Sequence, residues 1–491
     1  MTRRAVRVRT LGLAAVALAI AAAAVSPRLA GAGPSPASAR SAPSAPASPD
    51  PLTQASLARK HIKHVILIVS ENHTFDSMFG TYPGANGLPI NPDTGQPQGQ
   101  LCDGTTIDLH RGPDQPSGVD HSFLAGIHAI NGGQMNCFDK LGGGTVKGNH
   151  PGYAYYDRTS IPSYWAYADR YLLGDNYFSG EYGPTGPNIL WSLADSSGRF
   201  VTHEETGQFG TNGIRREYCG DRSERAWAFK KMTVSERAQV YGIEDGPWEI
   251  STPKQMLSFW VEKWPCVKIN TLPDELAAKG IRWRDYHGTN SFTQSIAMIR
   301  SIRLDKSKWS HVVSDGRIVT DIKNGKLPGV SWLTPSWSTS EHPPESMCVG
   351  ENWLVGMVNA VMRSKYWNST AIVVTYDEFG GFYDHVAPAH PDIYGFGPRL
   401  PLLIISPWTR RGSNPDGGYI DHTEYSLDSI LRMIEVLKGI APMHTNTRDG
   451  IADSMLGAFD FSQTPISAHL ESAKRTCSGV QTHAPAPAGT S

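Results

Sequence analysis

The stretch that decides the fold is "HVILIVSENHTFDSMFG", residues 64–80. Its apolar run from Val65 to Val69 is unbroken, which predicts a strand that is covered on both faces. The run ends in Ser70, and Glu71 and Asn72 follow directly. A buried strand that ends in a carboxylate beside a carboxamide indicates either a solvated loop or a site for chemistry.

Apolar strand patterns recur along the chain and alternate with helical patterns. Strands are predicted at 64–70, 281–287, 329–335, 370–378 and 400–408. Helices are predicted at 160–173, 271–279, 292–302, 350–364 and 423–437. This alternation predicts an α/β fold with a mostly parallel central sheet that is flanked by helices. The region 190–265 is rich in Gly, Trp and Pro and has little periodicity, so we expect a loop-rich insertion there.

The two ends of the chain differ in composition from its middle. Four arginines, the apolar run 11–25 and the small residues 30–32 predict a signal peptide over 1–32, although a membrane anchor is the alternative. The Pro/Ala/Ser-rich segment 33–51 predicts a linker, 52–478 the folded domain, and 479–491 a flexible tail. We therefore expect a secreted protein, either extracellular or associated with the cell wall.

Composition excludes some classes of partner. The chain has 491 residues, 40% of them hydrophobic, and a net charge of −1, so it offers no bulk electrostatic attraction for nucleic acid. Its six cysteines lack C-x-x-C spacing, which argues against structural zinc. Export permits up to three disulfides, but six cysteines allow about 15 pairings and the sequence does not choose among them. The oligomeric state stays open.

Polar side chains follow four of the predicted strands. Glu71-Asn72 follow the first strand, Asp377-Glu378 follow strand 370–376, His287 ends strand 281–287, and Glu341-His342 come after strand 329–335 and a short loop. In open α/β sheets, ligands collect beyond the carboxyl ends of the strands. This convergence predicts a functional site at one edge of the sheet.

Glu71, Asn72, Asp377 and Glu378 together offer three carboxylates and one amide oxygen. Carboxylates that crowd together raise one another's pKa, and a divalent cation would remove that conflict. Ligation by oxygen alone favours one hard ion such as Ca²⁺, Mg²⁺ or Mn²⁺ over zinc. The alternative interpretation is ordinary helix caps and surface salt bridges.

The segment "YGPTGPN", residues 182–188, predicts a tight turn, with Pro187 as the first residue of a helix that continues through 188–195. Thr185 would then precede a helix N-terminus, where free N–H groups favour phosphate. A metal-activated hydroxyl at this position can attack phosphorus, whereas the alternative role is an N-cap.

His121, His287 and His342 lie in polar, Gly/Pro-flanked contexts. They are candidates for binding phosphoryl oxygens or protonating a leaving group, and the alternative is a structural role.

Four blocks of the sequence resemble a known family: "IVSENHTFDSMFGTYPGANG", "VDHSFLAGIHAINGGQMNCF", "YGPTGPN" and "TYDEFGGFYDHVAP". They are similar to the bacterial phosphoesterase family of secreted phospholipases C and acid phosphatases, over roughly residues 60–440. The resemblance implies an alkaline-phosphatase-like fold with a single metal. It implies Glu71, Asn72, Asp377, Glu378 and Thr185 as ligands, Thr185 as nucleophile, and His121, His287 and His342 as phosphoryl-group residues.

The chain departs from the family pattern in three places. Gly186 follows Thr185 where Asp is usual, Ser122 follows His121 where Asp is common, and 199–265 matches nothing in the pattern.

The leading hypothesis is a secreted, metal-dependent phosphoesterase that cleaves phosphodiesters through a covalent phosphothreonine. Its substrates would include phospholipids at a membrane surface. The alternatives are an acid phosphatase that acts on monoesters and a non-catalytic secreted binding protein. No G-x-S-x-G motif supports a serine hydrolase.

Overall fold

The computed structural model describes residues 50–202, 217–288, 294–445, 447–472 and 474–481. Three predicted segments lie wholly or mostly outside the described residues: the signal peptide, the linker except for its last two residues, and most of the tail. The described chain begins with helix α1 (Pro51–His61), which Asp50 caps by accepting hydrogen bonds from two backbone N–H groups. No helix in these ranges is long and apolar enough to cross a membrane.

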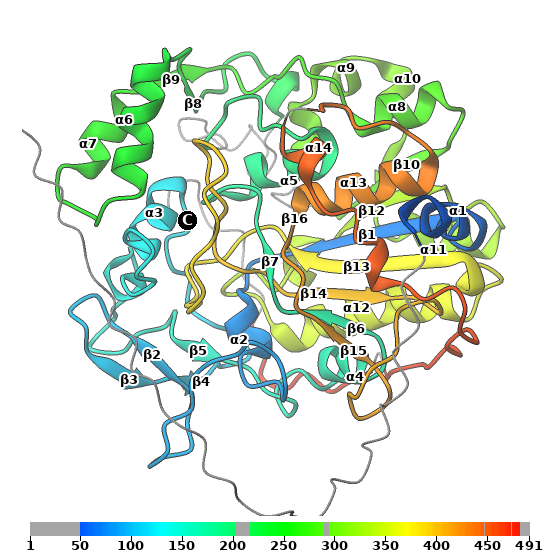
Figure 1. Ribbon diagram of the computed structural model, residues 1–491, viewed down its shortest axis with the longest axis horizontal. Coiled ribbons are helices and arrows are strands. Elements are labelled where there is room, and N and C mark those ends of the chain that lie inside the picture. Colours follow the sequence, from blue (N-terminus) through cyan, green and yellow to red (C-terminus); the bar gives the residue numbers. More distant parts are fainter. Residues whose placement is uncertain (1–49, 203–216, 289–293, 446, 473, 482–491) are drawn as a thin grey trace, which may run out of the picture. The chain divides into compact units, whose positions relative to one another are not determined.

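The described part of the chain builds an eight-stranded central sheet in the order β11-β10-β12-β1-β13-β14-β6-β15 (Figure 1). Its strands are β1 (His64–Ser70), β6 (Leu172–Gly174), β10 (Trp283–His287), β11 (Val312–Ser314), β12 (Val330–Thr334), β13 (Thr370–Tyr376), β14 (Leu402–Ile405) and β15 (Tyr419–Asp421). The predicted α/β class is confirmed, and the strand that opens the sequence pattern lies in the middle of the sheet.

One strand of this sheet runs against the others. β14 is antiparallel to both of its neighbours, whereas every other neighbouring pair is parallel, so the remaining seven strands share one direction. The sequence predicts a strand at 400–408 but not its direction. The reason is the connection 377–401, which contains no helix or strand. Without a crossover the chain re-enters the sheet from the edge it has just left, which produces an antiparallel pair.

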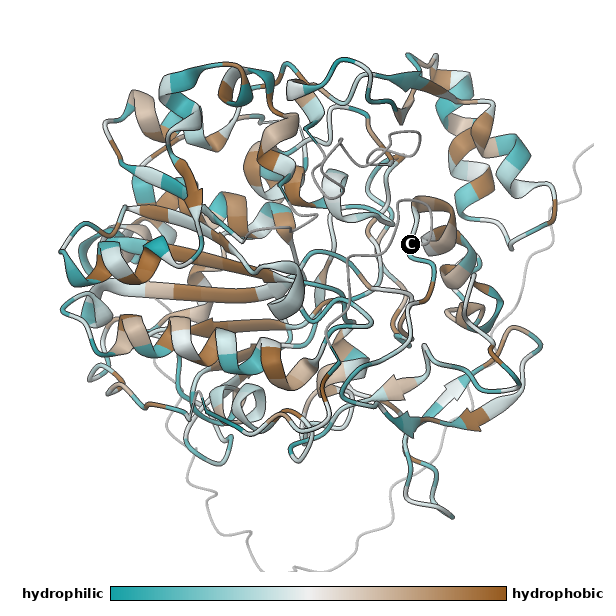
Figure 2. Ribbon diagram, turned by 180° about the vertical axis from the view of Figure 1, so that it is seen from behind, coloured by the Kyte–Doolittle hydropathy of each residue, from teal (hydrophilic) through white to brown (hydrophobic). Residues whose placement is uncertain are grey.

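Helices cover both faces of the sheet, which explains the unbroken apolar run in β1. Val65, Leu67 and Val69 pack into one core with α1 and with α5 (Thr185–Ala194), α8 (Leu272–Ala278) and α13 (Leu427–Lys438). Ile66 and Ile68 point to the other face and pack with α2 (Phe75–Phe79), α4 (Pro162–Arg170), α11 (Arg317–Lys323) and α12 (Met347–Met362). Figure 2 shows the central strands as predominantly hydrophobic. Neither face of the strand is left for solvent.

Four of the five predicted helices are confirmed as α4, α8, α12 and α13, with shifted ends. The prediction of one helix over 292–302 is wrong for the residues that are described. A 3₁₀ turn (Ser295–Met298) and the short α9 (Arg300–Arg303) stand in its place. Ile299 between them is extended and pairs with Val267, whose N–H and C=O bond to Met298 and Arg300. This tertiary pairing breaks the helical hydrogen-bond pattern.

The region 190–265 contains regular structure that its composition did not predict. Helix α6 (Val234–Glu244) opens with a capping box between Thr233 and Glu236, and strands β8 (Ala226–Phe229) and β9 (Trp260–Lys263) pair beside α7 (Thr252–Leu257). Their apolar side chains share a third core with α3 (Phe123–Ile130). The capping box was the available sequence signal for α6.

The remaining strands and α-helices of the described chain are short. They are the pairs β2 (Gln98–Gln100) with β3 (Thr106–Asp108), β4 (His110–Arg111) with β5 (Ala154–Tyr155) and β7 (Tyr177–Phe178) with β16 (Tyr425–Ser426), and helices α10 (Lys306–Trp309) and α14 (Arg448–Ile451). Three disulfides are present and settle the pairing that the sequence left open: Cys102–Cys137, Cys219–Cys266 and Cys348–Cys477.

Candidate active site

The predicted site residues begin where β1 and β13 end. Ser70 lies opposite Tyr376 in this parallel pair, so Glu71 and Asp377 emerge side by side. The Asp377 N–H donates to the Ser70 carbonyl over 3.2 Å, and the Glu71 N–H donates to Ser340 over 2.9 Å. The ends of β1 and β13 and the segment after β12 are therefore joined at one edge of the sheet.

Glycines let the turn after β13 close onto this edge. Gly380 has a φ of +63°, and a Cβ on it would lie 2.5 Å from the Cβ of Asn72. The Gly380 N–H donates to Glu378 Oε2 over 2.9 Å. A larger residue at this position would meet both strain and a clash, so glycine is required to bring Glu378 and Asn72 together.

The four predicted metal residues are almost completely buried, with exposed fractions of 1% for Glu71 and 0% for Asn72, Asp377 and Glu378. Burial raises the pKa of Asp377 well above its usual range, and the charge of Glu378 raises it further. Burial likewise raises the pKa of Glu378, with a smaller contribution from the charge of Glu71. Negative charge at this edge is therefore costly unless a cation accompanies it.

Unsatisfied oxygens provide a test of whether these residues fit a cation. Among the described residues, Asn72 Oδ1 and Glu378 Oε1 are buried and have no hydrogen-bond partner. Each buried unsatisfied polar atom costs about 1–3 kcal/mol. The donors are carboxylate and amide oxygens, which are the ligands that hard divalent cations prefer. The donor set therefore fits the predicted ion.

The three carboxylates are nevertheless not tightly gathered. In the described ranges, two groups of three ligand-type residues have atoms within 4.8 Å of one another, and Glu71, Asp377 and Glu378 do not form such a group. The first group is Asp76, Asp384 and His385, whose two carboxylates are paired with the buried Arg399 at 2.9 Å each. The second is Cys102, His128 and Cys137, in which the two cysteines form a disulfide. Neither group has the unsatisfied oxygens of the sheet edge.

Thr185 is the first residue of α5, so the helix begins two residues before the predicted Pro187. Pro184 occupies the N-cap position, and the alternative role of Thr185 as an N-cap is wrong. Thr185 is 2% exposed. The Thr185 side chain lies beside Asp377 and partly counteracts the rise in the pKa of that carboxyl. The structure thus places the predicted nucleophile beside a predicted metal ligand.

Asn188 clamps the turn that presents Thr185. Its Oδ1 accepts the Glu181 N–H over 2.9 Å, and its Nδ2 donates to the carbonyls of Glu181 and Pro184 over 3.2 and 3.4 Å. Gly183 in the same turn has a φ of +151°, and a Cβ there would lie 2.3 Å from the carbonyl oxygen of His121. Close packing therefore brings the His121 segment against the turn.

His121 and His342 are brought together, with ring centroids 5.4 Å apart and planes at 71°. His121 Nδ1 lies 2.7 Å from the Val119 carbonyl, and His342 Nδ1 lies 2.7 Å from the Pro343 carbonyl. A carbonyl only accepts, so Nδ1 carries the proton in both rings. Nε2 of His121 then faces Glu378 Oε1 at 3.8 Å. Burial lowers the pKa of His121, which favours the neutral ring.

His287 ends β10 at the same edge of the sheet. Its Nδ1 lies 2.8 Å from the Thr334 hydroxyl and 3.7 Å from Asp285 Oδ1. Burial raises the pKa of Asp285 to about 7. His287 is therefore positioned by its own strand and by β12.

Two further residues of this region received no role from the sequence. Asp120 is half-buried, and its charge helps to raise the pKa of Glu378 and opposes the fall in that of His121. The available signal was a carboxylate directly before a candidate histidine. Glu341 is completely buried and accepts hydrogen bonds from Tyr164 and Tyr376. Its place after a strand was visible in the sequence, but its tyrosine partners, 177 and 35 residues away, were not.

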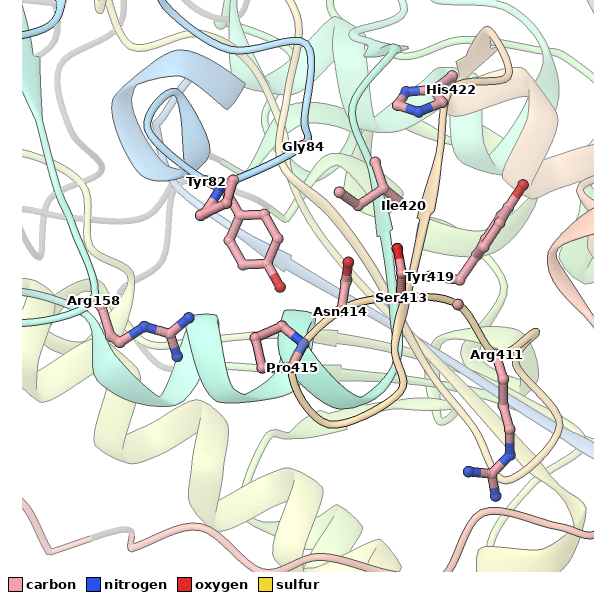
Figure 3. Close-up of a pocket in the computed structure, with 12 residues that line it drawn as sticks. Tyr82, Gly84, Arg158, Arg411, Ser413, Asn414, Pro415, Tyr419, Ile420 and His422 are labelled. Atoms are coloured by element: carbon pink, nitrogen blue, oxygen red, sulfur yellow. The ribbon is translucent and has the colours of Figure 1, made fainter.

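A cavity of about 580 Å³ lies away from these residues, against edge strand β15 (Figure 3). The described residues that line it include Tyr82, Arg158, Asn414, Tyr419 and His422, and none of the predicted site residues. Arg158 is paired with Asp169, and His422 with Asp175. The size of this cavity therefore does not identify the chemical site, which we assign to the sheet edge.

Comparisons with known proteins agree with the sequence blocks. The Phosphoesterase family matches residues 62–441. "Phospholipase C B" of Mycobacterium tuberculosis is 25% identical, over 82% of this chain and 78% of that protein. "Non-hemolytic phospholipase C" of Pseudomonas aeruginosa is 24% identical, over 82% of this chain and 58% of that protein.

A solved structure of a Vibrio parahaemolyticus protein in the alkaline phosphatase superfamily is 11% identical, over 80% of this chain and 76% of that one, with a TM-score of 0.31. This likeness is weak, and the α/β class of the chain is given by its own central sheet. The family match covers more than three quarters of the sequence and includes every predicted site residue. The chain therefore belongs to the Phosphoesterase family, and it is a hydrolase that acts on phosphoric ester bonds.

Proposed function

We propose that this hydrolase cleaves phosphodiesters in the manner of a phospholipase C, with Thr185 as its nucleophile. The observation that carries the proposal is the buried Thr185 at the start of α5, whose side chain lies beside Asp377, at the same sheet edge as the unsatisfied oxygens of Asn72 and Glu378. The names of the relatives support a diester substrate. We expect the substrate to be a phospholipid at a membrane surface.

Glu71, Asn72, Asp377, Glu378 and Thr185 would hold one hard divalent ion. When bound, such an ion would lower the pKa of the Thr185 hydroxyl and offset the charge of the phosphoryl oxygens. The N–H groups at the start of α5 would bind the same oxygens, since a helix N-terminus favours anions.

The proposed reaction has two covalent steps. Thr185 Oγ forms a bond to phosphorus as the bond between phosphorus and the diacylglycerol oxygen breaks. His342 or His121 passes the hydroxyl proton through Nε2 to the departing alcohol. Water then attacks the phosphothreonine, the bond to Thr185 Oγ breaks, and the water proton returns to that oxygen. The products are diacylglycerol and the phosphorylated headgroup.

Secretion is part of the proposal, because the arginine-rich and apolar residues 1–32 have the pattern of a signal peptide. N-terminal sequencing of the exported protein would test it. An intact N-terminus at Met1 in the culture medium would contradict cleavage after this segment.

Thr185→Ala and Thr185→Ser test the nucleophile on phosphatidylcholine, p-nitrophenylphosphorylcholine and p-nitrophenyl phosphate. We expect the alanine variant to lose about 10³-fold or more in kcat and the serine variant to keep much of the activity, because serine supplies the same hydroxyl. Thr233→Ala, at the start of the distant α6, is the matched control and should keep kcat.

Two results would decide against the proposal. Full activity of Thr185→Ala on every substrate would exclude Thr185 as nucleophile. A strong preference of the wild type for p-nitrophenyl phosphate over both diesters would identify a phosphatase acting on monoesters instead.

A further inference from the structure

Glu341 has surroundings that the proposed chemistry does not use. It lies between Ser340 and His342, and it is completely buried. Both of its carboxylate oxygens accept hydrogen bonds from the Tyr164 hydroxyl, each over 2.9 Å, and Oε2 also accepts from the Tyr376 hydroxyl. The hydroxyl oxygens of Tyr164 and Tyr376 are 3.1 Å apart, and both side chains are at most 1% exposed. The buried Glu341 carboxyl group and the two tyrosine hydroxyls thus form one hydrogen-bond network.

The backbone at Glu341 is strained, with a φ of +73°. For a non-glycine residue this conformation costs about 1–3 kcal/mol, and glycine would adopt it freely. The side chain also passes close to α12, where a Cβ added to Gly350 would lie 2.1 Å from Glu341 Cγ. The chain keeps a glutamate in a strained conformation at 341 and a glycine at 350 that leaves room for its side chain. These two features indicate that the carboxyl group itself is needed at this point.

The network reaches three segments of the active site. Ser340, directly before Glu341, accepts the Glu71 N–H through its carbonyl and the His342 N–H through its hydroxyl over 3.1 Å. His342 follows Glu341. Tyr376, which donates to Glu341, directly precedes Asp377. Glu341 thus connects three segments: its backbone neighbours Ser340 and His342 lead to the end of β1 and to the candidate phosphoryl histidine, and its side chain reaches the end of β13 through Tyr376.

We propose that Glu341 is a positioning residue that holds His342, Glu71 and Asp377 in register through Ser340 and Tyr376. The inference rests on the proposed function, because it concerns the alignment of that same site. Glu341 does not touch the reacting atoms. It affects kcat by fixing the positions of the residues that touch the reacting atoms.

Glu341→Gln is the main test, with Glu351→Gln as its matched control. Glu351 is also a buried glutamate, 1% exposed, but its side chain faces the backbone N–H groups of Ser163 and Tyr164 and the Arg475 side chain, and it does not contact the Tyr164 hydroxyl. We expect Glu341→Gln to lower kcat on p-nitrophenylphosphorylcholine on the order of 10²-fold with a small change in KM, because misplacement of reacting groups by about 1 Å has this effect. We expect Glu351→Gln to keep kcat within about twofold while its melting temperature falls.

A double-mutant cycle separates positioning from general loss of packing. If Glu341 acts through Tyr376, the kcat losses of Glu341→Gln and Tyr376→Phe should be strongly non-additive, since either change breaks the same link. Tyr376→Phe removes one hydroxyl and leaves Glu341 in place, so it tests the link even if Glu341→Gln folds poorly.

Hydrogen exchange measured by mass spectrometry gives a readout that does not depend on activity. Glu341→Gln should speed exchange in peptides that cover 68–74 and 374–380, where the Glu71 and Asp377 N–H groups lie, and Glu351→Gln should not. A wild type that is inactive on every phosphoric ester would refute the proposed function. Glu341→Gln that matches Glu351→Gln in both kcat and exchange would overturn the positioning role.

Discussion

Asp285 is a buried carboxyl group whose effect on stability can be worked out from its position. It lies in the middle of β10, is 6% exposed, and has His287 Nδ1 3.7 Å away as its nearest ion-pair partner among the described residues. Burial alone raises its pKa from 3.8 to about 7. We predict that Asp285→Asn makes the protein markedly less sensitive to alkaline pH.

The sign follows from which state holds the proton. The unfolded chain loses the proton near pH 3.8, whereas the folded chain keeps it up to about pH 7. In that window stability falls as the pH rises, by about 1.36 kcal/mol per pH unit for one such group. From pH 5 to pH 8 the loss is about 2.5 kcal/mol, because it levels off above the folded-state pKa. Asparagine has no proton to lose and removes this contribution.

The assay is urea unfolding of the wild type and of Asp285→Asn at pH 5, 6, 7 and 8. The difference in unfolding free energy between variant and wild type should shift by about 2.5 kcal/mol in favour of the variant from pH 5 to pH 8. Asp93→Asn, in an exposed loop, is the control and should show no such shift. A difference for Asp285→Asn that stays constant within about 0.5 kcal/mol over this range would refute the reasoning.

Three further predictions concern the turn, a disulfide and the candidate metal ligands. Asn188→Ala should cost about 1–3 kcal/mol in urea unfolding, because it leaves the buried Glu181 N–H without its acceptor; an unchanged unfolding free energy would contradict the clamp. Replacing Cys348 and Cys477 by serine should lower stability by about 4–5 kcal/mol, since the disulfide closes a separation of 129 residues; an unchanged melting temperature would oppose this. Glu378→Gln should weaken Mn²⁺ or Ca²⁺ binding at least about tenfold in calorimetry, and unchanged affinity would remove Glu378 from the ligand set.

The sequence predicted those parts of the fold that depend on local pattern. The unbroken run Val65–Val69 required cover on both faces, and helices supply it. The direction of β14 was not predictable, because it depends on how the chain returns after 377–401 and not on the apolar residues of the strand. The break at Ile299 had the same origin, since pairing with the distant Val267 overrode a helical pattern.

The candidate site was predictable for a reason of topology. Parallel strands end at one edge whatever their order in the sheet, so Glu71 and Asp377 had to lie at the same edge if both followed parallel strands, and the direct pairing of β1 with β13 makes them neighbours. What topology cannot supply is the distance between side chains, and the carboxylates of Glu71, Asp377 and Glu378 are indeed less tightly gathered than the prediction of shared ligands suggests. That spacing depends on buried residues that contact the ends of the strands. Glu341, with its strained backbone and its hydrogen bond from Tyr376, is the strongest example. Strand ends therefore select the chemistry of such a site, whereas buried contacts between distant segments set its geometry.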